Sequence, residues 1–223
     1  MKSIPETAGK VKKAHPKSIF ECYSSEGVQY CVFPVEYKAV KHCLYDHYLG
    51  PVPNAILAFS DPLGALAVYN NLRSRHLEKN MRARGIKPIE LVRLWAPSEY
   101  PHGYLSRFVA ATLRYIQKTT DYDLVVSYAD GNAGRRGTIY RACNFIYMGE
   151  TEPDYVYYID GVRIAPHGVV NRYGTRSIPK LKQLLGSRLR IEKEKASKSR
   201  FFYPLNQKAK EFIKEVIACA GSY

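Results

Sequence analysis

Apolar side chains recur along this chain at two spacings, one typical of helices and one typical of strands. A period near 3.6 residues marks amphipathic helices, and short apolar runs bounded by turn residues mark strands. The predicted helices cover Glu36–Tyr48, Tyr104–Lys118, Ser177–Leu185 and Lys208–Ala218. The predicted strands cover Ser18–Tyr23, Gln29–Phe33, Ala55–Phe59, Ala65–Tyr69, Ile89–Trp95, Leu124–Tyr128, Phe145–Met148 and Tyr155–Ile159.

The order of these elements predicts an α/β (α+β) fold with a mixed, mostly antiparallel sheet flanked by helices. Hairpins give antiparallel pairs, whereas the helix Tyr104–Lys118 between two strands favours one parallel pair. The polar, arginine-rich segment Asn70–Lys87 is expected on the surface. A chain of 223 residues suits one domain with an appendage and needs no disulfide to support its core.

Charge divides the chain into three parts. Residues 1–18 carry five Lys against one Glu, residues 19–160 carry 15 basic and 15 acidic residues, and residues 161–223 carry 14 basic and four acidic residues. We therefore predict a basic, mobile arm (1–18), a neutral core (19–160) and a basic, helical C-terminal extension packed on it (161–223). Such a distribution suits a protein that binds a polyanion, and equally suits solvated tails that aid solubility.

Cysteine usage and hydropathy indicate a soluble protein of a reducing compartment. The five cysteines are odd in number and show no Cys-x-x-Cys spacing, which argues against a secreted disulfide framework. The lysine-rich start has no apolar signal region, and no apolar run reaches the roughly 18 residues of a membrane span. We expect a cytoplasmic protein with no membrane partner.

The segment between Leu124 and Glu150 carries the most specific pattern. An apolar strand leads into the turn sequence Asp130-Gly131-Asn132, a short helix follows, and a second strand begins near Phe145. A turn between a buried strand and a helix is where α/β proteins bind ligands. Within this segment, Tyr140-x-x-x-Asn144-Phe145 resembles the Tyr-x-x-x-Gly-Phe signature of the GNAT acyltransferase superfamily.

The chain as a whole is similar to the phage Mom family of DNA-modification proteins, and the resemblance covers all but Met1–Ser18. The usual Gln/Arg-x-x-Gly-x-Gly/Ala loop of GNAT enzymes is missing, and only His102-Gly103 precedes the helix. The matching pieces are His47-Tyr48, Glu90-Leu91-x-Arg93-Leu94, Ser106-Arg107-Phe108, Ser127-Tyr128-Ala129-Asp130, Gly137-Thr138-Ile139-Tyr140, Asn144-Phe145-x-Tyr147-x-Gly149, Arg172-Tyr173-Gly174 and Tyr203-Pro204-Leu205.

This resemblance implies a GNAT-like fold and an enzyme that modifies the N6 amino group of adenine in DNA. Acetyl-CoA is the implied donor, carbamoylmethyl adenine the implied product, and protection from restriction in the phage-infected bacterium the implied role. The base must leave double-stranded DNA, because its amino group is otherwise paired. Two alternatives stay open: an acetyltransferase acting on tRNA, protein or a small amine, and a non-catalytic DNA-binding protein of the same fold.

Five residues are the candidates for catalysis. Tyr140 would protonate a departing thiolate, or else fill the core as a half-buried ring. His47 would accept the proton of the attacking amine and Tyr48 would stack on a flipped base, unless the histidine is merely packed. Ser127 and Asp130 would orient base or donor, although an aspartate before glycine more often starts a turn.

Four residues are candidates for holding the donor. Arg107, beside Ser106, lies near a helix start, where a cation is unfavourable unless an anion such as a CoA phosphate or a DNA phosphate binds there. The alternative is an exposed arginine paired with Glu99. Asn144 would cap the short helix in a left-handed conformation or bond to the pantetheine, and the resemblance adds Tyr147.

Basic residues with an interleaved aromatic residue are the candidates for binding DNA. They are Arg135, Arg136 and Arg141 near the ligand loop, and Arg172, Tyr173 and Arg176 in the extension, where Lys180, Lys182, Arg188 and Arg190 follow. The charge run Glu192–Arg200 is expected to be mobile and to contact DNA without reading sequence, or to be simply solvated.

His42, Cys43, Asp46 and His47 contain two i,i+4 pairs on a predicted helix. Side chains four residues apart share one face of an α-helix, so these pairs could hold a divalent metal such as iron. No fourth ligand has an obvious origin, and ordinary helices carry such pairs by chance.

Overall fold

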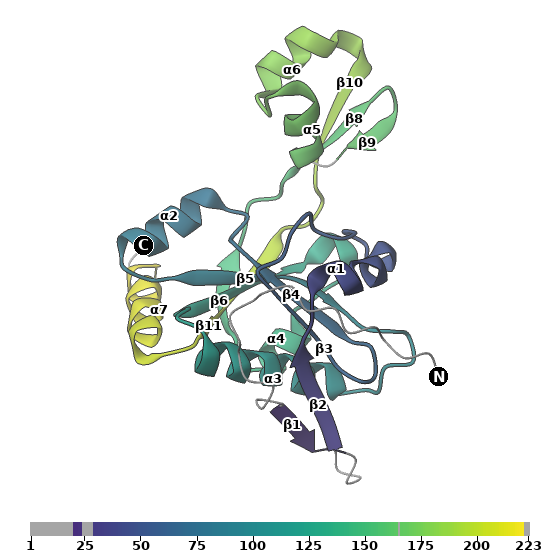
Figure 1. Ribbon diagram of the computed structural model, residues 1–223. Helices are drawn as coiled ribbons and strands as arrows, with labels where there is room; N and C mark the ends of the chain where they lie inside the picture. The colour runs from purple at the N-terminus through teal and green to yellow at the C-terminus, as the bar shows by residue number, and fades with distance from the viewer. Residues whose placement is uncertain (1–19, 24–28, 165, 221–223) are drawn as a thin grey trace.

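The structure, a computed structural model, describes residues 20–23, 29–164 and 166–220 (Figure 1). The predicted basic arm and the turn of the first hairpin lie outside these residues. The main sheet has the order β1-β2-β3-β4-β5-β6-β11-β7. Its strands are β1 (Phe20–Tyr23), β2 (Gln29–Pro34), β3 (Leu57–Ser60), β4 (Leu66–Asn70), β5 (Pro88–Trp95), β6 (Leu124–Asp130), β7 (Ile146–Glu150) and β11 (Lys198–Pro204).

All neighbouring strands of this sheet are antiparallel except β5 and β6, which are parallel. The predicted fold class, with one parallel pair around the long helix, is confirmed. The helices are α1 (Tyr37–Val40), α2 (Arg75–Ala83), α3 (Tyr104–Thr119), α4 (Thr138–Ala142), α5 (Pro166–Tyr173), α6 (Ile178–Leu185) and α7 (Gln207–Ala220), with 3-10 turns η1 (Lys41–Asp46), η2 (Gly131–Ala133) and η3 (Gly186–Arg188). None of these described helices has the length and apolar character needed to cross a membrane.

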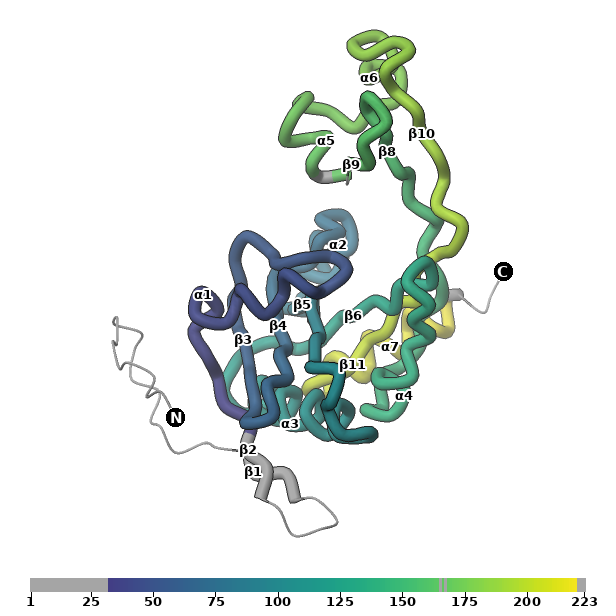
Figure 2. The backbone as a smooth tube through the Cα atoms, turned by 90° about the vertical axis from the view of Figure 1, so that its right-hand side faces the viewer, coloured from purple at the N-terminus to yellow at the C-terminus, as the bar shows by residue number. Residues whose placement is uncertain are grey.

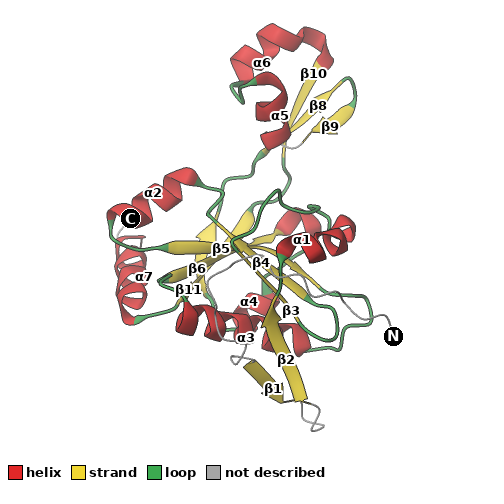
Figure 3. Ribbon diagram, in the orientation of Figure 1, coloured by secondary structure: helices red, strands yellow, loops and turns green. Residues whose placement is uncertain are grey.

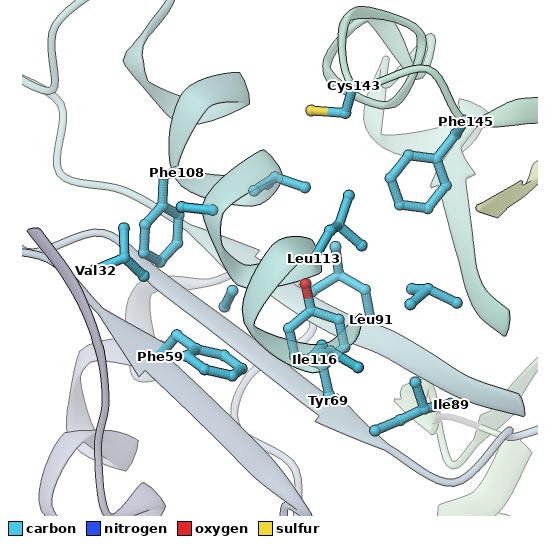
Figure 4. Close-up of a cluster of buried hydrophobic side chains, with 14 of the residues drawn as sticks. Val32, Phe59, Tyr69, Ile89, Leu91, Phe108, Leu113, Ile116, Cys143 and Phe145 are labelled. Carbon is cyan, nitrogen blue, oxygen red and sulfur yellow. The ribbon is translucent and has the colours of Figure 1, made fainter. Parts of the chain in front are cut away.

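Helices cover both faces of the central strands (Figure 3). On one face α3 buries Phe108, Leu113 and Ile116 against β4 and β5, in the cluster that Figure 4 shows. On the other face α2 and α7 pack on β6 and β11, and η1 packs on β4 and β5. Strands buried on both faces are mostly apolar, which explains the nearly continuous apolar runs in the sequence.

The parallel pair separates before its strands end. Pairing runs from Pro88 with Leu124 to Leu91 with Ser127, yet β5 continues to Trp95 and β6 to Asp130. A bulge in the pairing of β5 with β4 lies at the same level, and a bulge adds local twist to its strand. We call this region, residues 92–95 and 128–130, the β5–β6 fork.

One predicted strand lies outside the main sheet. Tyr155–Ile159 was expected to complete that sheet, but it is β8 of a separate three-stranded sheet with β9 (Val162–Ile164) and β10 (Leu189–Lys193). With α5 and α6 these strands form an inserted module, residues 151–197, which stands apart from the main sheet on two chain segments (Figure 2). A short apolar run predicts a strand but not which sheet it joins.

Three further expectations need correction. The helix predicted from Glu36 is one α-turn followed by the 3-10 turn η1, whereas the arginine-rich segment lies on the surface as expected and contains the helix α2. The charge run predicted as mobile contains parts of β10 and β11. β11 lies between β6 and β7, so the predicted extension (161–223) divides between the inserted module and the main sheet. The strand β11 was not predicted, because its charged side chains interrupt the apolar pattern.

Candidate functional site

The base of the β5–β6 fork is a chain of hydroxyl hydrogen bonds. Ser127 is fully buried at the last paired position of β6, and its Oγ donates to the carbonyl of Leu91 at 3.2 Å. The hydroxyls of Tyr140 and Ser127 are hydrogen-bonded to each other. Tyr140 therefore presents its phenol at the point where the two strands separate.

The position of Tyr140 is fixed by α4 and by aromatic packing. Its ring centroid lies 5.4 Å from that of Phe145 and 5.3 Å from that of Phe201. Asn144 ends α4 in the left-handed conformation with φ of 61°, as predicted for a cap, and the amide of Phe145 donates to the carbonyl of Tyr140. Burial raises the pKa of Tyr140 to about 12, although its bond to Ser127 opposes this rise. The phenol is neutral at pH 7.

His47 begins a loop (His47–Gly50) that lies beside the fork. Arg93 holds this loop, because its guanidinium donates to the carbonyls of Gly50 (2.6 Å) and Leu49 (3.1 Å). The Nδ1 of His47 accepts from the amide of Leu49 at 3.1 Å, and the ring also bonds to the backbone of Leu94 in β5. Burial and then the charges of Arg93, Arg135 and Arg73 lower the pKa of His47 to about 4, so the imidazole is neutral.

Tyr48 forms an exposed platform at the fork. Its ring stacks on His47 with centroids 4.7 Å apart, and 51% of the residue is accessible to solvent. Partial burial and the carboxylate of Asp130 raise its pKa, which indicates that the end of β6 is close. A flat, preordered aromatic face beside two strand ends suits a planar ligand.

Two arginines concentrate positive charge at the end of β5. Both donate to the carbonyl of Val92, Arg73 at 3.0 Å and Arg93 at 2.7 Å. Burial and the neighbouring Arg73 lower the pKa of Arg93 to about 10. Glu90, only 2% exposed, accepts from the amide of Arg73 at 2.8 Å and pairs with its Nε at 3.4 Å. Arg73 is therefore an ion-paired cation, and Arg93 uses its guanidinium to hold backbone carbonyls.

Asp130 has a turn role within the site. Its Oδ1 accepts from the backbone amide of Asn132 at 3.0 Å and from the side-chain amide of the same residue at 3.3 Å. This is the aspartate turn considered as the alternative in the sequence. The turn nevertheless places the buried carboxylate at the end of β6, within electrostatic range of Tyr48.

The start of α3 lies on the opposite face of the sheet from the His47–Gly50 loop. Gly103 caps the helix with φ of 80°, and Ser106 Oγ donates to the Gly103 carbonyl. The carbonyl of Ser106 accepts from the thiol of Cys143 at 3.1 Å, which joins this helix to α4. Arg107 is exposed, with its guanidinium 5.2 Å from the centroid of the Tyr104 ring.

These residues form a candidate anion site. The first turn of the 16-residue helix α3 has amide groups without intrahelical partners, which can bind an anion. Arg107 adds a cation on the same turn. β5 and β6 no longer pair with each other in the fork, and Tyr140 lies at the base of this gap. Tyr147 lies farther along, on the edge strand β7, where its hydroxyl donates to Glu150 at 3.0 Å.

The predicted DNA-binding residues fall into two groups. Arg135, Arg136 and Arg141 are exposed on the loop and helix after β6, and Arg135 is close enough to affect His47. Arg172, Tyr173 and Arg176 lie in the inserted module, on α5 and the turn that follows it. The structure thus does not bring the two groups into one patch.

The proposed metal residues do not gather. His42 and Asp46 are exposed, and the described residues contain no group of three or more His, Cys, Asp or Glu side chains placed to hold a metal. The reason is local geometry: η1 is a 3-10 turn, in which residues three apart align, so the i,i+4 pairs of an α-helix are lost.

Sequence reasoning assigned no role to Arg73, Glu90 or Arg93. Glu90 and Arg93 did carry a signal, since they interrupt an otherwise apolar strand. Arg73 had none, because its contacts depend on the loop before α2.

A surface depression of about 540 Å³ lies on α2, lined by Arg75, Glu78, Lys79, Arg82 and Ala83, and includes none of the fork residues.

Comparison with known proteins gives a family match over most of the chain. The Mom protein family matches residues 36–219. The methylcarbamoylase Mom of Escherichia phage Mu is 28% identical over 126 residues, which cover 55% of this chain and 50% of that protein. The match thus spans half the length of that relative.

Solved structures of similar shape have low sequence identity. An uncharacterized protein of Bacillus halodurans is 10% identical, with a TM-score of 0.49 and coverage of 90% of this chain and 97% of that one. Arabidopsis thaliana NAA60 in complex with acetyl-CoA is 10% identical, with a TM-score of 0.46 and coverage of 78% and 98%. A mutant spermidine N-acetyltransferase of Vibrio cholerae is 10% identical, with a TM-score of 0.44 and coverage of 82% and 98%.

Proposed function

The chain belongs to the Mom protein family, and from that premise we propose that it is a transferase that modifies the N6 amino group of adenine in DNA. The donor is acetyl-CoA or a related acyl-CoA, and the modified DNA resists restriction in the cytoplasm of the phage-infected bacterium. The observation that carries this proposal is the β5–β6 fork, with Tyr140 at its base and Tyr48 at its side.

The donor and the adenine bind on opposite faces of the sheet. The donor enters from the face of α3 and α4, where Ser106 and Arg107 hold its phosphates and Asn144 borders the pantetheine. The adenine, flipped from the duplex, enters from the face of the His47–Gly50 loop and stacks on Tyr48. The fork connects the faces, because β5 and β6 no longer pair there.

A thioester donor supplies an activated acyl group and a thiol leaving group. Tyr140 remains protonated at neutral pH and therefore can donate a proton to a departing thiolate. Asp130 accepts a hydrogen bond from the adenine amino group and orients it. In the free protein the Nδ1 of His47 bonds to Leu49 and holds the loop and Tyr48 in place. When the amine attacks the thioester carbonyl, this bond opens and the Nδ1 accepts the amine proton, while the departing thiolate takes the proton of Tyr140.

Charge at the mouth of the fork favours a nucleic acid substrate. Arg73 and Arg135 each lie within electrostatic range of the Tyr48 hydroxyl. Extrusion of a nucleotide costs a few kcal/mol. Ion pairs between such arginines and the phosphates on either side of the extruded nucleotide would offset this cost. Arg136 and Arg141 extend this basic region along the loop and α4.

The test is the nucleoside content of DNA from bacteria that express the protein. We expect a new adenine derivative by mass spectrometry, whose mass distinguishes an acetyl from a carbamoylmethyl group. Tyr48→Ala should remove it, whereas Tyr45→Ala, which changes a 70% exposed tyrosine three residues earlier, should not. Acetylated tRNA or protein without a new deoxynucleoside would reject the proposal in favour of an ordinary acetyltransferase.

A further inference from the structure

The inserted module concentrates positive charge on its surface. Residues 161–190 contain seven Arg and Lys and no Asp or Glu, and all seven are exposed. Arg188 pairs with Asp160 and Arg190 with Glu192. Within the described part of the chain, no ion pair uses the other five, which are Arg163, Arg172, Arg176, Lys180 and Lys182.

The module has a hydrophobic core of its own that supports this surface. Tyr157, Val169 and Leu181 are buried together with Ile159 and Leu185. The helices α5 and α6 are joined by four residues that begin with Gly174 in a left-handed conformation, the usual form of a tight helix–turn–helix connection. Since Leu181 and Leu185 point inward, Lys180 and Lys182 remain on the outside of α6.

The chain that leaves the module is bonded directly to the loop at the end of β6. The side chain of Asn132 donates to the carbonyl of Ala196 at 2.8 Å and accepts from the amide of Ala196 at 3.0 Å. It also donates to Glu194 at 3.3 Å. Gly131 lies so close to this segment that a Cβ would be 2.9 Å from the carbonyl oxygen of Ser197.

The loop that contains Asn132 is also bonded to Asp130, a residue of the β5–β6 fork. Asn132 bonds both to the returning segment of the module and to Asp130, the last residue of β6. The other chain segment of the module is fixed beside it, because Thr151 donates its amide to Lys198 and Glu150 accepts from Ser197. The module therefore cannot move at its base without disturbing the end of β6.

We propose that the inserted module is a docking surface for the backbone of double-stranded DNA, and that Asn132 is a positioning residue that keeps bound DNA in register with the β5–β6 fork. The inference rests on the proposed function for its substrate. DNA fits this surface better than a second copy of the chain, because two such modules would oppose like charges. Phosphates that pair with the basic residues of segment 161–190, which contains no Asp or Glu, release counterions and stabilise binding.

The docking surface is tested by removing the same number of charges from two different surfaces. The variant Arg172→Gln/Arg176→Gln/Lys180→Gln is compared with Lys118→Gln/Lys210→Gln/Lys214→Gln, which removes three exposed charges from α3 and α7. Binding of a labelled duplex is measured by fluorescence anisotropy at several salt concentrations. We expect the log–log salt slope of the first variant alone to become shallower, by about 0.9 for each phosphate that the protein no longer neutralises. Equal slopes in the two variants would overturn the docking surface.

The positioning role is tested with Asn132→Ala and, independently, Gly131→Ala. Both should leave duplex and acetyl-CoA affinity within about twofold of wild type, while the rate of DNA modification at saturating substrates falls at least about tenfold, which is about 1.4 kcal/mol. Wild-type rates in both variants would overturn it. If the wild type itself modifies no DNA, the proposed function fails, yet the salt slopes still decide whether the module docks DNA.

Discussion

Gly134 and Gly137 form a matched pair that tests how the packing around Tyr140 is set. Both lie in the loop before α4 with left-handed φ values of 68° and 72°. A Cβ at Gly134 would meet nothing within 4 Å, whereas one at Gly137 would lie 2.5 Å from Cε2 of Phe201 and closer still to its Cζ. Phe201 is fully buried and cannot withdraw.

Substitution by alanine separates the cost of a left-handed backbone conformation from the cost of overpacking against Phe201. Each variant carries the left-handed penalty of about 1–2 kcal/mol, and only Gly137→Ala adds an overpacking cost of about 1–3 kcal/mol. For a protein of this size each kcal/mol lowers Tm by about 2–4 °C. Gly137→Ala should therefore melt about 2–12 °C below Gly134→Ala.

The assay is thermal unfolding followed by circular dichroism, with DNA modification measured on the same preparations. Because Phe201 packs on Tyr140, we expect Gly137→Ala to lose activity below its melting temperature and Gly134→Ala to keep it. Equal melting temperatures for the two variants would refute the proposed packing of Phe201 over Gly137.

Three other predictions concern single side chains. Tyr140→Phe should lower kcat by about 10²–10⁴-fold with unchanged acetyl-CoA affinity, measured by steady-state kinetics, if the phenol is the general acid; an unchanged kcat would remove it from that role. His47 has a pKa of about 4 in the folded state and 6.5 as its ordinary value. Its titration therefore leaves the free energy of unfolding unchanged above pH 6.5 and lowers it by up to about 3 kcal/mol as the pH drops to 4, because the unfolded chain takes up the proton first. His47→Gln should flatten this part of the denaturant-measured pH profile, and parallel profiles would contradict the low pKa. Burial raises the pKa of Cys143 to about 11, so an alkylating reagent at pH 8 should label the exposed Cys219 and leave Cys143 unmodified in the native protein, as peptide mass spectrometry can show.

Local pattern predicted much of the sheet and the helix beneath it. Periodicity placed α3 within one residue, because its buried positions repeat every three to four residues. The strands β4 to β7 were found because apolar runs and turn residues bounded them. The prediction that Asn144 caps α4 is also confirmed, since asparagine tolerates a left-handed conformation.

What the sequence did not contain was long-range pairing. β11 mixes basic and aromatic residues, and its place between β6 and β7 depends on partners about 50 to 80 positions away. The cluster of Arg73, Arg93 and His47 likewise joins three distant segments. The roles of the site residues remain predictions, because they depend on substrates as well as on the positions of the side chains.

The placement of β11 has a consequence for how the protein is made. β6 leaves the ribosome some 70 residues before the strand that pairs with it, and the intervening chain must form the whole inserted module. Sheets closed by such distant partners assemble slowly, because loop closure precedes the gain from pairing. During synthesis the edge of β6 should therefore stay open until β11 emerges, which makes the nascent chain a natural substrate for chaperones.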